Sequence, residues 1–150
     1  MKGARLRSGT TLVELAVVLG VLAVLIGLAV PPLGRGLDRH AAWRARDALV
    51  AGIARTRATA VARGGAVLVV DVAAGRFWIE TPGGERVGEP VDLRREYGVR
   101  LAVDGGGEAR LSLRFDGLGI ARMANRTLRV VRGGAEAGVT LSAYGRVRRW

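Results

Sequence analysis

The amino-acid sequence predicts an α+β protein in which a long N-terminal helix packs on a small antiparallel β-sheet domain. Two observations lead to this prediction. The N-terminal part is almost entirely apolar and continues into a segment with helical spacing that ends at Gly64-Gly65. The remainder consists of short runs with the alternation typical of strands, separated by glycine-rich turns. A chain of 150 residues suits one modest globular domain beyond such a helix.

The chain starts with a basic stretch, and a long apolar segment follows it. Residues 1–9 contain Lys2, Arg5 and Arg7 and no acid, whereas every residue from Leu12 to Leu33 is apolar or small except Glu14. As a helix this segment would be about 33 Å long, at ~1.5 Å per residue, which is enough to cross the hydrocarbon core of a bilayer. The basic residues favour an N-terminus that stays in the cytoplasm.

Glu14 is the unusual residue of the apolar segment. A carboxylate in hydrocarbon is costly, so it normally has a partner and a function. Cleavage of the chain after Gly9 would create such a partner, because a new α-amino group on Thr10 lies four residues before Glu14. Within one helix the amine and the carboxylate would meet only loosely. Between staggered neighbours in a filament they would pair well.

The stretch Gly9-Thr10-Thr11-Leu12-Val13-Glu14-Leu15 resembles the class III signal of type IV pilins and pseudopilins. The resemblance implies that a prepilin peptidase cleaves after Gly9 and methylates the new N-terminus at Thr10. It also implies that Glu14 docks the subunit into a growing filament. Thr10 departs from the family, which usually has phenylalanine at this position. Pro31 agrees with the family pattern, because pilins often carry a helix-loosening proline at this position.

This resemblance divides the chain into three parts. Residues 1–9 are the leader peptide, residues 10–36 the transmembrane and filament-core helix segment, and residues 37–150 a periplasmic pilin-like globular domain. It implies a single pass through the inner membrane, followed by incorporation into a periplasmic or extracellular pilus or pseudopilus. Two other interpretations are a secretory signal cleaved near Ala29 and a signal anchor that is not cleaved. Neither explains the carboxylate in the apolar segment or its spacing from the cleavage position.

The first part of the globular domain is predicted to be helical. Pro31 and Pro32 lack backbone N–H groups, so a kink or break is expected there, with the helix resuming from Leu37 to about Arg63. The positions with helical spacing, expected to face the core, are Ala42, Ala45, Leu49, Ile53, Thr56 and Ala60. The arginines expected to be solvated are Arg55, Arg57 and Arg63.

Strand patterning begins after the helix. From Arg110 to Phe115, apolar residues alternate with basic or polar ones, which predicts a half-buried strand with a basic outer face. Pro82-Gly83-Gly84 and Asp104-Gly105-Gly106-Gly107 are strong turn signals. The other predicted strands are Ala66 to Val72, Arg76 to Thr81, Thr127 to Arg132 and Val139 to Ala143.

Three later segments resemble the GspH/FimT branch of the pilin superfamily. Ala48 to Gly64 resembles the end of that branch's helix, Phe115 to Gly119 its central F-x-x-x-G turn, and Ser142 to Arg148 its C-terminal strand ending in G-R-x-R. Together with the N-terminal signal, these segments span nearly the whole chain. The resemblance implies a pilin-like fold and partners that are other pilins or pseudopilins.

Catalytic sites are not apparent in the sequence. The chain has no cysteine and one histidine, His40, which argues against a transition-metal site. Ser142 has no Ser-His-Asp companions, and Gly105 to Gly107 lacks the G-x-x-x-x-G-K pattern of a phosphate-binding loop. We therefore expect a protein that is not an enzyme and that needs neither a metal nor another cofactor.

The C-terminal part is strongly basic, in a chain whose formal net charge is +11. Between residues 121 and 150, seven arginines are opposed by a single acid, Glu136. If the last strand continues, Arg146 and Arg148 lie on one face with Cα atoms about 7 Å apart. Guanidinium groups placed in this way suit the binding of phosphate oxygens. The alternative is a solvated strand end.

The G-R-x-R resemblance favours phosphate binding. In FimT-like minor pilins this segment is associated with DNA binding during natural transformation. The candidate DNA-binding residues here are Arg129, Arg132, Arg146, Arg148 and Arg149. The leading hypothesis is therefore a minor pilin of a type IV pilus that captures extracellular DNA. The alternative is a GspH-like minor pseudopilin with a structural role near the tip of a type II secretion pseudopilus.

Overall fold

A computed structural model describes residues 11–105, 108–121 and 125–150, with the backbone alone for residues 28–33. Gly9 and Thr10 lie outside the described residues, so cleavage and methylation at these positions stay predictions. The chain forms two compact units, Met1–Gly34 and Arg35–Trp150.

Helix α1 (Leu12–Arg63) begins at a Thr-x-x-Glu sequence. The hydroxyl of Thr11 accepts a hydrogen bond from the backbone N–H of Glu14 at 3.2 Å, and its carbonyl oxygen accepts one from the N–H of Leu15 at 3.1 Å. This is an N-cap, and a carboxylate in the first helical turn complements the positive end of the helix dipole. Glu14 therefore has a local role at the helix start, in addition to the predicted role in filament assembly.

The described turns of α1 in the first unit expose their apolar side chains. The exposed large hydrophobic residues there are Leu12, Val13, Leu15, Val17, Val18, Leu19, Val21, Leu22, Val24, Leu25 and Ile26. A continuous apolar surface of this kind is typical of a site that another molecule covers. Within the residues that the structure describes, no helical stretch is both long enough and apolar enough to span a membrane.

The backbone of α1 stays helical through Pro31 and Pro32, so of the two predicted outcomes, a kink or a break, the break is wrong. Each proline removes one N–H donor from the helix. The helical turns before and after the pair continue on both sides, and the loss of two donors does not end the helix.

In the second unit, one face of α1 is buried with the spacing that the sequence predicts. The residues of this face, none more than 1% exposed, are Ala42, Ala45, Leu49, Ile53, Thr56 and Ala60. The hydroxyl of Thr56 donates a hydrogen bond to the carbonyl oxygen of Gly52 at 2.8 Å, which satisfies this buried polar group. A Cβ at Gly52 would lie 2.5 Å from Cε2 of Phe77, so the missing side chain lets the ring approach the helix.

The remaining elements of the second unit are strands and one short helix. The first group of strands is β1 (Gly65–Asp71), β2 (Arg76–Glu80), β3 (Arg86–Asp92) and β5 (Arg110–Asp116). The second group is β4 (Arg100–Val103), β6 (Arg126–Arg132), β7 (Ala135–Leu141) and β8 (Val147–Arg149). Helix α2 (Leu93–Tyr97) lies between β3 and β4 in the chain.

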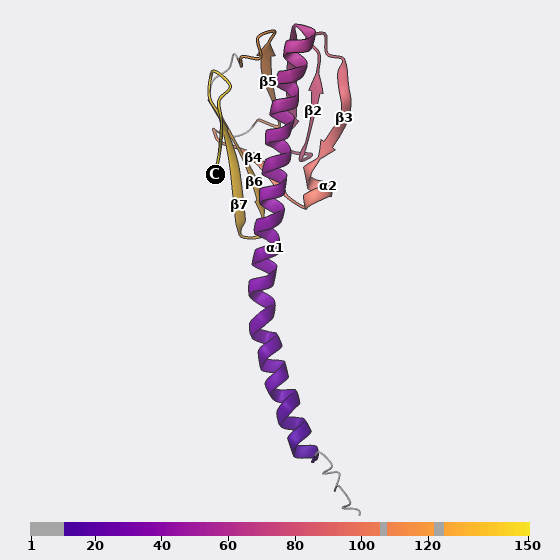
Figure 1. Ribbon diagram of the computed structural model, residues 1–150, viewed down its shortest axis with the longest axis vertical. Coiled ribbons are helices and arrows are strands. Elements are labelled where there is room, and N and C mark those ends of the chain that lie inside the picture. The colour runs from indigo at the N-terminus through magenta and orange to yellow at the C-terminus, as the bar shows by residue number, and fades with distance from the viewer. Residues whose placement is uncertain (1–10, 106–107, 122–124) are drawn as a thin grey trace, which may run out of the picture. The chain divides into compact units, whose positions relative to one another are not determined.

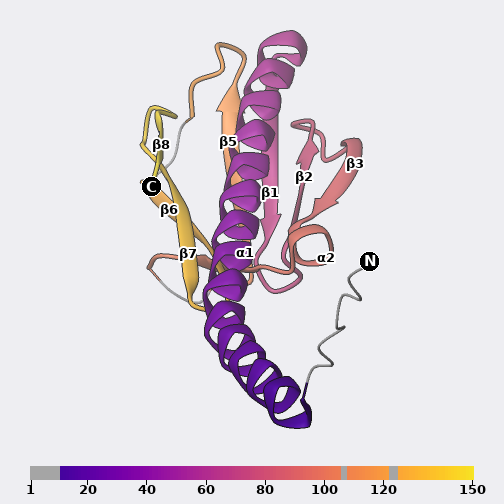
Figure 2. The same ribbon diagram turned by 60° about the horizontal axis from the view of Figure 1, so that its bottom comes forward.

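In the described residues these strands form two antiparallel sheets, with the orders β3-β2-β1-β5 and β4-β6-β7-β8. Figures 1 and 2 show that the part of α1 in the second unit lies across both sheets. The inner face of each sheet and the buried face of α1 share one hydrophobic core. The α+β architecture predicted from the sequence is confirmed, with two sheets in place of the single one expected. The outer face of each sheet points away from this core and carries most of the strand arginines considered below.

Candidate nucleic-acid interface

The C-terminal segment is a hairpin, so the prediction that the last strand continues through it is wrong. Strand β7 ends at Leu141, and the chain reverses over residues 142–145 before β8 pairs with β7. The N–H of Gly145 donates to the carbonyl oxygen of Ser142 at 2.8 Å, and the N–H of Ser142 donates to the carbonyl oxygen of Arg146 at 2.9 Å. Gly145 has a φ of 83°, in the left-handed region that favours glycine. The glycine of G-R-x-R therefore turns the chain.

The hairpin places the C-terminal arginines in different surroundings. Arg148 is paired with Thr140, and Arg149 is paired with the buried Val139, so alternation puts Arg148 on the outer face and Arg149 on the inner one. Arg146 lies in the connection before β8. Arg146 and Arg148 are exposed, and neither forms an ion pair within the part of the chain that the structure describes.

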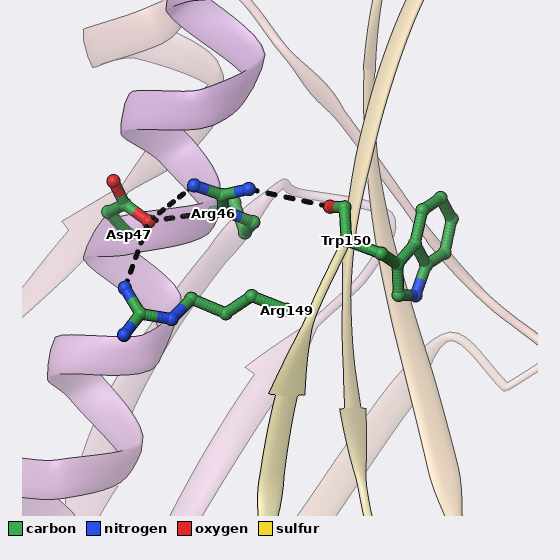
Figure 3. A network of polar contacts seen from close by, with 4 residues as sticks. All are labelled: Arg46, Asp47, Arg149 and Trp150. Atoms are coloured by element: carbon green, nitrogen blue, oxygen red, sulfur yellow. Dashed lines mark hydrogen bonds and ion pairs between the residues drawn. The ribbon is translucent and has the colours of Figure 1, made fainter.

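Figure 3 shows how the chain end is attached to α1. Nη1 of Arg149 lies 3.9 Å from Oδ1 of Asp47, and Nη2 of Arg46 lies 2.9 Å from the same oxygen. Nη1 of Arg46 also donates a hydrogen bond of 3.5 Å to the carbonyl oxygen of Trp150. The charge of Arg149 is therefore partly offset by an acid of α1, whereas that of Arg148 is not.

Trp150 extends the pairing with β7 by one residue. Its N–H and carbonyl oxygen form hydrogen bonds of 3.1 and 3.0 Å with the backbone of Gly138. The indole covers this glycine, because a Cβ at Gly138 would lie 2.3 Å from the ring atom Cζ2. Trp150 is 49% exposed and shares the strand parity of Arg148. The outer face of the hairpin therefore carries a guanidinium group and an accessible aromatic ring.

Arg129 and Arg132 are engaged with acids of their own domain. Nε of Arg129 lies 2.8 Å from Oδ1 of Asp104, an ion pair without hydrogen-bond geometry, and its Nη1 donates to Oε1 of Glu136 at 3.3 Å. Arg132 donates from Nε to Oδ1 of Asp38 at 3.0 Å. Both were predicted to bind DNA together with the C-terminal arginines. The charges of Arg129 and Arg132 are therefore already opposed by acids of the same domain.

Arg57 was predicted to be solvated, and this prediction is wrong. Its Nη2 donates a hydrogen bond to the carbonyl oxygen of Gly145, and its guanidinium carbon lies 5.6 Å from the centre of the Phe115 ring. The stem of Arg57 fills the space beside Gly119, where a Cβ would lie 2.8 Å from its Cγ. Arg57 therefore connects α1 to the F-x-x-x-G turn and to the hairpin. Its periodicity alone could not reveal this, because both partners are distant in the sequence.

The side chains around the hairpin suit the binding of an anion. The hydroxyl of Ser142 accepts a hydrogen bond from the N–H of Arg146 at 3.0 Å, so it serves the turn. His40 is exposed on α1. Among the described residues, no group of three or more His, Cys, Asp or Glu side chains could hold a metal ion. The hairpin presents arginine guanidinium groups on a backbone held by hydrogen bonds, and this arrangement suits the binding of anionic oxygens.

Comparison with known proteins identifies relatives of this chain. The family described as Type II transport protein GspH matches residues 45–145. The pilin-like protein PilA1 of Thermus thermophilus is 35% identical over 156 residues, covering 95% of this chain and 97% of that protein.

Solved structures of two minor subunits share the fold. The minor pseudopilin EpsH from the type II secretion system of Vibrio cholerae is 16% identical, with a TM-score of 0.55 over 73% of this chain and 95% of that one. The type IV minor pilin FimU of Pseudomonas aeruginosa is 18% identical, with a TM-score of 0.55 over 79% of this chain and 91% of that one. The two similarities are alike in strength, so the fold does not distinguish a pilus subunit from a secretion subunit.

These relatives confirm the resemblance that the sequence motifs indicate. Proteins of this family assemble with other pilins or pseudopilins into surface or periplasmic filaments. The chain therefore belongs to the GspH family of pilin-like proteins.

Proposed function

We propose that this chain is a minor pilin that binds extracellular DNA through its C-terminal hairpin during natural transformation. The observation that carries the proposal is the exposure of the Arg146 and Arg148 side chains without an acid beside them among the described residues. Such guanidinium groups can neutralise backbone phosphates, which gives binding that tolerates sequence and weakens steeply with salt.

The hairpin needs little ordering before it binds. The turn has its own backbone hydrogen bonds, and Arg57 donates to the carbonyl oxygen of Gly145 from outside. The end of the chain is held by Gly138 and Arg46. A backbone fixed in this way reduces the conformational entropy that binding costs, so the phosphate contacts contribute more of their energy to affinity.

A DNA-binding measurement tests the proposal. The full chain in a non-ionic detergent would be titrated against a labelled DNA duplex, and the dissociation constant measured over a series of salt concentrations. We expect the double variant Arg146→Gln, Arg148→Gln to bind at least roughly tenfold more weakly. The salt dependence, which is the slope of log Kd against log salt concentration, should correspond to about two fewer released counterions. The control is Arg55→Gln with Arg63→Gln, which removes the same charge from exposed positions of α1. Equal effects of the two double variants would reject the hairpin as the DNA site.

The proposal also assigns a role to the N-terminal part of α1, which is to anchor the subunit and to pack against other subunits. Its exposed apolar side chains, Leu12 to Ile26, support a segment that sits in the inner membrane and later packs against other subunits. A prepilin peptidase would release this segment by cleavage after Gly9. The new amine of Thr10 would then offset the carboxylate of Glu14 on a neighbouring subunit. N-terminal sequencing of the protein from cells should start at Thr10, and an intact Met1 would reject this processing.

A second candidate function is that of a structural minor pseudopilin in a type II secretion system. A cleft of about 580 Å³ lies on the side of α1 that faces the β6–β7 turn, and this cleft favours the binding of a protein partner. It is lined by Arg35, Asp38, Arg39, Trp43, Gly134, Ala135 and Glu136, and Trp43 is 47% exposed. Deletion of the gene separates the two functions, because a pseudopilin is required for protein secretion and a DNA-binding pilin for transformation.

A further inference from the structure

Three arginines surround one tryptophan on the outer face of the first sheet. The guanidinium carbons of Arg76, Arg86 and Arg110 lie 5.9, 5.1 and 5.3 Å from the centre of the Trp78 ring. They come from three different strands, β2, β3 and β5. Trp78 itself is only 5% exposed, so these side chains cover its ring. Each distance is within the range of a cation–π interaction.

The strand register explains why these side chains meet. Asp71 of β1 is opposite Arg76 on one side and opposite Arg110 on the other. Arg86 of β3 is opposite Glu80, two residues after Trp78. Since residues two apart on a strand share a face, all of these side chains lie on the outer face. Nε1 of Trp78 donates a hydrogen bond to Oε1 of Glu80 at 2.6 Å, which fixes the ring.

The register also places four acids on this face, Asp71, Glu80, Asp92 and Asp116, and each accepts a hydrogen bond from another group of the chain. Arg114 of β5 is a fourth exposed arginine with the same parity as Arg110. Asp71 accepts a hydrogen bond from the N–H of Ala74 at 2.9 Å and lies 3.8 Å from Nη2 of Arg76, and Glu80 accepts the hydrogen bond of Trp78. Among the described residues, no ion pair is found for Arg86, Arg110 or Arg114. Packing over Trp78 explains why the arginine stems are there, but it does not bring the guanidinium groups of Arg86, Arg110 and Arg114 into an ion pair within the described residues.

Converging guanidinium groups of this kind suit phosphate oxygens. A guanidinium stacked on an aromatic ring is already oriented, so it loses less freedom when it forms paired hydrogen bonds to a phosphate. Repulsion between the arginines would fall when an anion binds between them. Trp78 is covered, so it cannot stack on an unpaired base. The ligand that fits is therefore a phosphate backbone, without base contacts.

We propose that the outer face of the first sheet, centred on Trp78, is a second contact surface for the DNA backbone, separate from the C-terminal hairpin. The inference rests on the proposed function, since DNA is its ligand. A second copy of this chain is a poor occupant, because its net charge of +11 is also positive. Arg86 and Arg110 lie on the outer face of the first sheet, whereas Arg148 lies on that of the second sheet and Arg146 in the connection before β8. The contributions of the two surfaces to binding can therefore be removed one at a time.

The test uses the full chain in non-ionic detergent and the same labelled duplex and salt series. Arg86→Gln with Arg110→Gln should weaken binding at least roughly tenfold and lower the salt dependence by about two counterions. Arg86→Lys with Arg110→Lys keeps the charge but loses the planar group. It should keep the salt dependence of the unchanged chain and still bind more weakly. Far-UV circular dichroism checks that each variant is folded.

The outcomes separate this inference from the proposed function. If the Arg86, Arg110 pair has no more effect than the Arg55, Arg63 control, the second surface is rejected, whatever the hairpin variant shows. If the pair weakens DNA binding while the hairpin variant does not, the second surface stands and the hairpin site is wrong. If the pair changes binding only to vesicles of anionic phospholipid, the face binds a membrane and the inference is overturned.

Discussion

The side chain of Arg57, on α1, donates a hydrogen bond to the carbonyl oxygen of Gly145, at the end of the turn between β7 and β8. The same guanidinium lies over the ring of Phe115 on β5. One residue of the helix thus contacts an edge strand of the first sheet and the hairpin of the second. The position of the proposed DNA-binding arginines therefore depends on a helix residue that itself touches no ligand.

Replacing Arg57 by methionine should destabilise the protein modestly. Arg57→Met keeps a long apolar stem but leaves the carbonyl oxygen of Gly145 without its donor. A hydrogen bond from a charged group contributes about 1.5–3 kcal/mol. The buried Nε of Arg57 has no hydrogen-bond partner among the described residues, so its removal offsets part of this loss of stability. We expect the free energy of unfolding in urea to fall by about 1 kcal/mol. Arg55→Met, at an exposed position of the same helix, should change it by less than about 0.5 kcal/mol. Equal losses would argue against the link.

A side chain at Gly138 should displace the indole of Trp150. A Cβ there would lie 2.3 Å from Cζ2 of the ring, which is too close for either atom to stay in place. In Gly138→Ala we expect Trp150 to become more accessible, measured as stronger quenching of tryptophan fluorescence by iodide. Gly134→Ala is the matched control, because no atom lies within 4 Å of a Cβ at that position. Unchanged quenching in Gly138→Ala would mean that the ring does not rest on this glycine in solution.

Neighbouring arginines of β8 should differ in their effect on DNA binding. Arg148→Gln and Arg149→Gln remove the same charge one residue apart. Arg149 faces Asp47 at 3.9 Å, whereas Arg148 is exposed on the outer face. We expect Arg148→Gln to lower the salt dependence by about one counterion and Arg149→Gln to lower it by less. An equal or larger effect of Arg149→Gln in the same titration would contradict the assigned faces.

Tyr97 should ionise at higher pH than an ordinary tyrosine. Its hydrogen bond with the side chain of Glu96, followed by burial and the charge of Glu96, raises the pKa of Tyr97 above 10.0. A raised pKa means that folding favours the neutral phenol. The associated stability is present below pH 10 and is lost as the pH rises through the pKa of the folded state. Ultraviolet titration of the chain against Tyr97→Phe isolates this group, and Glu96→Gln should lower its pKa. Ionisation of Tyr97 at or below its ordinary pKa would contradict this contact.

The sequence predicts the elements whose pattern is local. The buried face of α1, from Ala42 to Ala60, follows from helical spacing alone. Strand β5 follows from strict alternation, and β1, β2 and β6 agree with their predicted ranges to within one residue at each end. Strand β3 was missed because Gly88 and Pro90 lie within it, and both residues are depleted in strands.

Features that depend on distant residues could not be predicted in this way. The division into two sheets is a matter of strand pairing, which no local pattern specifies. The reversal at Gly145 had a signal, since glycine commonly marks a turn, but the alternation on both sides of it suggested one strand. Arg129 and Arg132 look like free charges in the sequence, and their partners Asp104 and Asp38 are found only through the fold.

The most direct test of the proposed function is transformation by cells whose native gene carries Arg146→Gln and Arg148→Gln. Immunoblotting of sheared filaments would establish that the variant subunit is still incorporated, and the Arg55→Gln, Arg63→Gln strain is the charge-matched control. The proposal predicts that the hairpin strain incorporates the subunit normally and transforms nearly as poorly as a deletion strain, while the control strain transforms normally. Normal transformation by a hairpin strain with normal incorporation would contradict it.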